Sequence, residues 1–93
     1  MGARFLIEVP HDVTRPACAH AIDVFLKTGS HFLTHADWGC KDGVHKAWIV
    51  VDVDTREQAM GIVPAAFWSS AVIVRLNAFT AEDVELLRQD AGH

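Results

Sequence analysis

The chain has 93 residues, of which 51% are hydrophobic and 22% charged, so it is large enough for one globular domain and its composition excludes intrinsic disorder. The net charge of −4 argues against a nucleic-acid partner, because phosphate contacts need a basic surface. No apolar run approaches the ~18 residues of a membrane span, and the first residues lack the pattern of a signal peptide. We therefore expect a cytoplasmic protein whose single domain covers residues 1–93.

The first predicted elements are a strand and a helix. Residues 4–9 alternate between two faces, and Pro10 ends this strand. Thr14 is a good N-cap for the following helix, Pro16 suits its first turn, and Gly29 is expected to be its C-cap.

A hairpin is predicted next, because strand-like residues 31–37 and 46–53 flank an Asp42-Gly43 turn. Asp54 and Glu57 then form a capping-box-like pair at the start of a second helix, which ends before Pro64. After an apolar connector at 64–70, residues 71–76 form a fourth strand and Thr80 caps a last helix.

This order of elements predicts an α+β, ferredoxin-like βαββαβ fold with a four-stranded antiparallel sheet and an extra C-terminal helix. The helix-covered face of the sheet is predicted to hold Phe5, Ile7, Val9, Phe32, Ala36, Ala47, Ile49, Val51, Val72 and Val74. The open face is predicted to hold Arg4, Leu6, Glu8, His31, Leu33, His35, Asp37, Lys46, Trp48, Val50, Ile73 and Arg75.

The open face combines a large apolar patch with titratable groups. Its apolar members, Leu6, Leu33, Trp48, Val50 and Ile73, need a cover, which a second subunit, the last helix or a ligand could supply. We therefore predict a homo-oligomer, a dimer or higher, that is built over this face.

His35 and Asp37 are the candidate catalytic residues. On a strand they lie on one face about 7 Å apart, which suits an acid–base pair. The same spacing also suits a polar pair at an interface or two metal ligands. The candidate ligand-binding residues are Arg4, Glu8, His31, Lys46, Trp48 and Arg75, with the arginines suited to the carboxylate of a small organic acid and the indole to stacking or to the interface.

A metal site is left open. His31 and His35 would lie about 13 Å apart on a strand, too far to share one ion. A third ligand such as Cys40 or His45 is predicted to point to the opposite face. Cys18 is expected to be a buried free thiol, Cys40 an accessible one, and His11, His20 and His93 surface residues.

A family resemblance rests on His45, Ala47, the Val-Asp-Val-Asp run at 51–54 and the apolar connector. With the order of elements, these residues resemble muconolactone isomerase and its small relatives in the dimeric α/β-barrel superfamily. The resemblance implies a ferredoxin-like subunit, oligomerisation and a site between the sheet and its cover, but no catalytic residue. The His-x-x-x-His and Trp-Gly-Cys stretches also resemble a small bacterial family of unassigned role.

Two functions remain open from the sequence. One is a small oligomeric protein that binds an organic ligand on the open face, as a cofactor-free isomerase- or oxygenase-like enzyme would. The alternative is a non-catalytic module for metal binding, ligand binding or assembly. No phosphate-binding loop, Ser-His-Asp arrangement or two-cysteine zinc motif is present, so no cofactor is predicted.

Overall fold

Over the residues that the structure describes, the fold is α+β, with one four-stranded antiparallel sheet and four helices. The computed structural model describes residues 2–28 and 30–91. In chain order the elements are β1 (Ala3–Pro10), α1 (Arg15–Lys27), α2 (His31–Thr34), β2 (Asp37–Trp38), the 3₁₀ turn η1 (Cys40–Asp42), β3 (Lys46–Val53), α3 (Arg56–Ile62), the 3₁₀ turn η2 (Ala65–Phe67), β4 (Val72–Leu76) and α4 (Ala81–Ala91). The strand order β2-β3-β1-β4 is compatible with the ferredoxin-like arrangement and confirms the predicted fold class.

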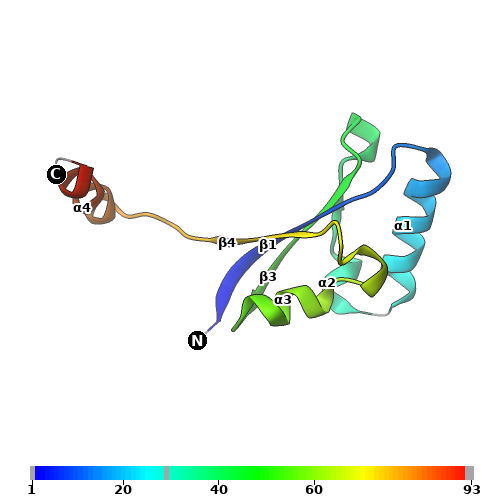
Figure 1. The fold of residues 1–93 in the computed structure, drawn as a ribbon, viewed down its shortest axis with the longest axis horizontal. Coiled ribbons are helices and arrows are strands. Elements are labelled where there is room, and N and C mark those ends of the chain that lie inside the picture. Colours follow the sequence, from blue (N-terminus) through cyan, green and yellow to red (C-terminus); the bar gives the residue numbers. More distant parts are fainter. Residues whose placement is uncertain (1, 29, 92–93) are drawn as a thin grey trace.

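The core lies between the sheet and the helices α1, α2 and α3, which gather on one side of it (Figure 1). Alternate residues of the two central strands point into it, as predicted from their period of two. The buried hydrophobic side chains are Phe5, Ile7, Val9, Ala21, Phe25, Leu33, Ala47, Ile49, Val51, Ala59 and Val63.

The register of β3 gives a direct test of this core. Ile49 is 3% exposed, whereas its neighbour Val50 is 52% exposed on the other face. Ile49→Ala is expected to lower the free energy of unfolding by about 2–5 kcal/mol, because it leaves a cavity among packed side chains. Val50→Ala is the control and should change it by less than about 0.5 kcal/mol in urea denaturation. Equal effects of the two variants would contradict the register.

The predicted first strand of the hairpin is wrong over most of its length. His31–Thr34 form the helix α2, and β2 is limited to Asp37–Trp38. The helical turn buries Leu33 in the core and leaves Phe32 38% exposed, the reverse of the predicted faces. A short apolar run does not distinguish a strand from a helix. In this segment the helical turn is the conformation that buries Leu33. The turn itself is confirmed in part, since Gly43 has a positive φ of 81° after η1.

The faces of β4 are also inverted relative to the prediction. Ile73 lies opposite Ile7 on the covered side, whereas Val74 lies opposite Leu6 on the open side. Val72 and Val74 are 47% and 43% exposed and so do not belong to the core. Apolar residues occur on both faces of this strand, so its alternation carried no information about the register.

The ends of two helices differ slightly from the prediction. Thr55, not Asp54, caps α3, and Gln58 rather than Glu57 completes the capping box. Helix α1 ends at Lys27 with Thr28 as its C-cap. Gly29, the predicted C-cap, lies outside the described residues.

Helix α4 lies apart from the rest of the molecule, beyond an extended segment that follows β4 (Figure 1). Thr80 caps it as predicted, since its Oγ1 accepts from the Asp83 backbone N–H at 3.1 Å. The radius of gyration is 16.4 Å, whereas a compact domain of this length has about 12 Å. Among the described residues, no helix combines the length and the apolar character needed to cross a bilayer.

Candidate metal centre

Four side chains from distant parts of the sequence converge on one point: His11, Cys18, Cys40 and His45. One ligand atom from each lies within 4.8 Å of the other three. Cys18 Sγ is 3.3 Å from His45 Nδ1, and Cys40 Sγ is 3.2 Å from His11 Nε2. All four residues are partly buried, so the cluster lies at the edge of the core rather than on the open surface.

The backbone fixes two of these residues through the ends of the central strands. His11 follows β1 and His45 precedes β3, and these strands pair up to the Pro10–Lys46 position. The His11 backbone N–H donates to the His45 carbonyl at 3.0 Å, which extends the ladder by one bond. The two imidazole centroids are consequently only 5.7 Å apart.

Cys18 is held in the first turn of α1. Thr14 caps this helix by accepting from the Ala17 backbone N–H at 3.2 Å. Pro16 occupies a first-turn position, where a missing N–H costs nothing. The Cys18 N–H then donates to the Thr14 carbonyl at 3.0 Å, so the start of the helix sets the position of the thiol.

Cys40 is presented by a tight loop that depends on Gly39. A Cβ at position 39 would lie 2.6 Å from the Val44 carbonyl oxygen and 2.8 Å from the Trp48 ring. The Gly39 carbonyl accepts the backbone N–H groups of Asp42 and Val44, both at 3.0 Å. Only glycine fits between the loop and the indole, and it brings Cys40 close to His11.

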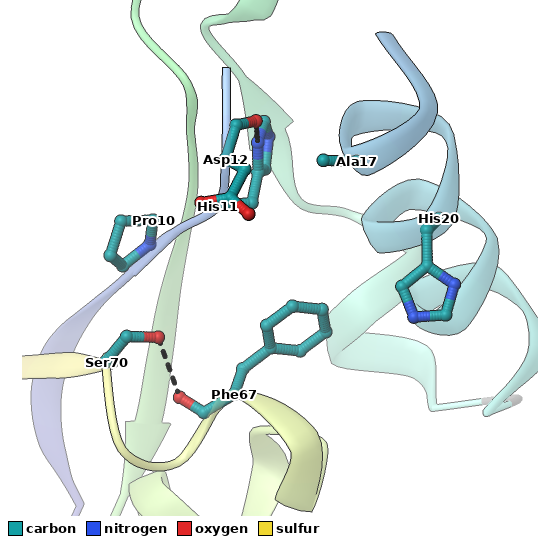
Figure 2. Close-up of a pocket in the computed structure, with 7 residues that line it drawn as sticks. All are labelled: Pro10, His11, Asp12, Ala17, His20, Phe67 and Ser70. Atoms are coloured by element: carbon teal, nitrogen blue, oxygen red, sulfur yellow. Dashed lines mark hydrogen bonds between the residues drawn. The ribbon is translucent and has the colours of Figure 1, made fainter. Parts of the chain in front are cut away.

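The geometry of His11 favours metal binding through one specific nitrogen. Its Nδ1 lies 3.0 Å from the Asp12 carbonyl oxygen, which can only accept, so Nδ1 carries the proton. Figure 2 shows this contact on the wall of a cavity of about 460 Å³ between β1, α1 and η2. The unprotonated Nε2 therefore faces Cys40. A histidine that donates its second N–H to a backbone carbonyl is the usual arrangement around zinc.

The spacing of the four atoms fits a tetrahedral ion. Zinc bonds of about 2.3 Å to sulfur and 2.0–2.1 Å to nitrogen place tetrahedral ligand atoms about 3.3–3.8 Å apart. The two contacts between candidate ligand atoms, 3.3 Å from Cys18 Sγ to His45 Nδ1 and 3.2 Å from Cys40 Sγ to His11 Nε2, are close to this range.

Desolvation raises the pKa of the Cys18 thiol above its ordinary value, and the neighbouring Cys40 thiol raises this pKa further. Without a cation this thiol is therefore neutral at pH 7. A bound divalent cation would reverse that balance, because a coordinating thiol is deprotonated outright. Binding of a metal ion would therefore release the proton of the Cys18 thiol.

The open face carries a polar cluster that sequence analysis did identify. Glu8, Lys46 and Trp48 come from the paired strands β1 and β3. The Trp48 indole N–H donates to Glu8 Oε1 at 3.0 Å, and Lys46 Nζ lies 3.4 Å from the same oxygen. These three candidate ligand-binding residues therefore satisfy one another in the described structure.

This pairing predicts a pH dependence. The indole hydrogen bond lowers the pKa of Glu8 below its ordinary 4.5, with desolvation opposing and Lys46 assisting. A lowered carboxyl pKa adds stability above the unfolded value that is lost as pH falls through the folded one. Wild-type protein should therefore lose about 1 kcal/mol more than Glu8→Gln between about pH 6 and pH 3 in urea denaturation.

The control for this experiment is Asp23→Asn, which removes a carboxylate from an exposed ion pair with Lys27. Exposed pairs of this kind contribute little, so its pH profile should follow that of the wild type. A Glu8→Gln profile that also follows the wild type would contradict the assigned role of Glu8.

The other predicted site residues are not brought together. Arg4 lies opposite Leu76 and Asp52, whereas Arg75 lies opposite Phe5 and so belongs to the other face of the sheet. The expectation that Arg4, Glu8 and Arg75 share one face is therefore wrong, because the register of β4 is shifted by one residue from the predicted one.

His31 and His35 are also placed differently from the prediction. They lie one helical turn apart on and after α2, with ring centroids 4.6 Å apart rather than about 13 Å. Both rings line a shallow cavity of about 280 Å³ with Asp52 of β3. Asp37, at the start of β2, lines a separate cavity of about 430 Å³ beside Cys40. His35 and Asp37, the predicted pair, therefore line different cavities.

Sequence analysis missed the cluster as a set. The sequence predicted a surface position for His11 and a buried free thiol at Cys18. Both residues are partly buried members of the cluster, and Cys18 is a free cysteine. Cys40 and His45 were weighed as metal ligands and were expected to point away from the open face. They do lie on the helix-covered side, where His45 contacts Cys18 of α1, but they were not matched with His11 and Cys18. The available signal was the C-x₄-H spacing of Cys40 and His45 around a Gly-containing turn. His20 is exposed as expected, and His93 lies outside the described residues.

Comparison with protein-family models, with curated proteins and with solved structures finds no match to this chain. The resemblance to the muconolactone isomerase family therefore stays a prediction.

Proposed function

We propose that this protein binds one Zn²⁺ ion through Cys18, Cys40, His11 and His45. The observation that carries the proposal is the convergence of two thiols and two imidazoles within 4.8 Å of one another. Two sulfur and two nitrogen ligands in tetrahedral positions are a typical set for structural zinc. This function corresponds to the metal-binding module that the sequence left open as an alternative.

Zinc explains the cluster better than a catalytic cysteine does. A nucleophilic thiol needs one imidazole and a lowered pKa, whereas the pKa of Cys18 is raised. A metal site needs all four groups, and it also accounts for the contact between His11 Nδ1 and the Asp12 carbonyl. In the cytoplasm, the predicted compartment, the thiols stay reduced and available as ligands.

Metal titration of the purified, reduced protein tests the proposal. We expect one equivalent of Zn²⁺ to bind in competition with a chromophoric chelator. Co²⁺ should give the intense d–d bands of tetrahedral coordination together with sulfur-to-cobalt charge transfer. Mg²⁺ and Ca²⁺ are hard cations that prefer oxygen ligands, and they should not compete. Absence of stoichiometric Zn²⁺ binding, or octahedral cobalt spectra, would refute the proposal.

A second candidate function is ligand binding on the open face, as in an isomerase- or oxygenase-like enzyme. It is supported by the apolar residues that surround Glu8 and Trp48 on that face, since such a surface needs a cover. It is weakened by the separation of Arg75 from Arg4.

A further inference from the structure

A second cavity opens directly beside the proposed metal ligands. It has a volume of about 610 Å³ and lies between the start of α1 and the loop that carries Cys40. Its eight lining residues are Val13, Arg15, Cys18, Ala19, Ile22, Cys40, Lys41 and His45. This volume is within the range of small-molecule sites. Three of the four cluster residues form one wall, so a molecule in the cavity would contact the cluster itself.

The charges around this cavity are of one sign. Arg15 and Lys41 are its two charged residues, and none of the eight is acidic. Neither forms an ion pair with any residue that the structure describes. Acidic residues are in excess in this chain, whose net charge is −4, yet none of them lines this cavity. Two unpaired cations at one concave site favour an anionic ligand.

The rest of the cavity is apolar. Val13, Ala19 and Ile22 form this part of the wall, and Val13 is 73% exposed. An inorganic anion would leave these side chains uncovered, whereas an organic body would remove them from water. The site therefore fits an anion that carries an apolar group.

The metal adds little charge of its own. Zn²⁺ with two thiolates and two neutral imidazoles has no net charge, so the recognition of an anion falls to Arg15 and Lys41. Asp37 lines an adjoining cavity that shares Ile22, Cys40 and Lys41 with this one, and it is not among the residues that line the proposed site.

We propose that this cavity binds a small organic carboxylate, with its carboxylate between Arg15 and Lys41 and its apolar body against Val13, Ala19 and Ile22. The inference goes beyond zinc binding, because it rests on the cavity and its charges. It assigns to the α1 side of the molecule the organic acid that sequence analysis expected on the open face.

The test uses benzoate as the probe and benzamide as its neutral counterpart of nearly the same shape. Titration of ¹⁵N-labelled, zinc-treated protein with benzoate should shift the backbone amide signals of residues 13–22 and 40–45, with a dissociation constant of about 1 mM or tighter. Benzamide and inorganic phosphate should each bind at least about tenfold more weakly. The proposal would be overturned if benzamide bound as tightly as benzoate. It would also be overturned if benzoate shifted only amide signals outside residues 13–22 and 40–45.

Substitutions of Arg15 and Lys41 distinguish the contribution of these two charges to benzoate binding from the contribution of the metal. Arg15→Gln and Lys41→Gln should each weaken benzoate binding about tenfold and leave zinc stoichiometry unchanged, because neither residue is a metal ligand. Lys27→Gln, at the other end of α1 and paired with Asp23, is the matched control and should bind benzoate like the wild type. Unchanged benzoate affinity in both cavity variants would refute the inference.

The same titration on protein treated with a chelator keeps the two proposals distinguishable. Selective benzoate binding without any zinc binding would support the carboxylate site and refute the metal centre. Zinc binding without selective benzoate binding would support the metal centre and refute the carboxylate site.

Discussion

Replacing Cys18 or Cys40 with serine is expected to lower the affinity for Zn²⁺ by more than about 100-fold. Loss of an outer-shell partner already costs about 10–100-fold in metal affinity, and loss of a thiolate ligand should cost more. Serine keeps the size of the side chain but supplies a hydroxyl that does not ionise near neutral pH. The competition assay with a chromophoric chelator measures the change.

The loss of zinc affinity in the serine variants should also be visible in the thermal stability of the protein. A ligand that binds only the folded state at 1,000 times its dissociation constant adds about 4.1 kcal/mol to the free energy of unfolding. Wild-type protein should therefore gain several degrees in thermal midpoint on addition of Zn²⁺, and both serine variants should gain almost none. Comparison in the presence of chelator separates this effect from any intrinsic destabilisation by the substitution.

Histidine variants provide the matched control. His20→Ala removes an exposed imidazole from α1 that lies outside the cluster, and His35→Ala removes one beside α2. Both should bind zinc like the wild type, whereas His11→Ala and His45→Ala should not. Full zinc affinity in Cys18→Ser, or an equal loss in His20→Ala, would contradict the four-ligand site.

The sequence predicted the central part of the fold because its signals there are local and redundant. In β1 and β3, strict alternation buries Ile7 and Ile49 and leaves their neighbours less buried. Thr14 and Thr80 are recognisable caps because the first turn of a helix has unpaired N–H groups that a hydroxyl can accept. The same signals were weak at α2 and β4, where apolar residues suit either face or either type of element.

The metal cluster was harder to predict because its residues come from four separate segments. His11 and Cys18 are seven residues apart across the turn between β1 and α1, and Cys40 and His45 follow more than twenty residues later. Their proximity depends on the pairing of β1 with β3 and on the close packing of Gly39 against Trp48. Neither contact is visible as a spacing in the sequence. Cys40 and His45 could be suspected as ligands, but the complete set of four could be recognised only after the tertiary contacts were known.

The last prediction concerns the two apolar surfaces that the described chain leaves without a cover. On the open face, Leu6 lies between Val50 of β3 and Val74 of β4, and both valines are substantially exposed. On α4, which lies away from the sheet (Figure 1), Leu86 and Leu87 are 53% and 55% exposed. Exposed apolar surfaces of this kind mark sites of association, so we expect a dimer in which each copy covers apolar surface of the other.

Sedimentation velocity at micromolar concentration should give twice the mass of the chain for the wild type. Val74→Lys should weaken the dimer by about 100-fold or more, because association would bury an unpaired charge on the open face next to Leu6. Leu26→Lys is the matched control, since Leu26 is 57% exposed on α1, outside both surfaces. A monomeric wild type would refute the dimer. Equal masses for the wild type and Val74→Lys would show that association does not use this face, and would leave the apolar edge of α4 as the surface to change next, by Leu86→Lys.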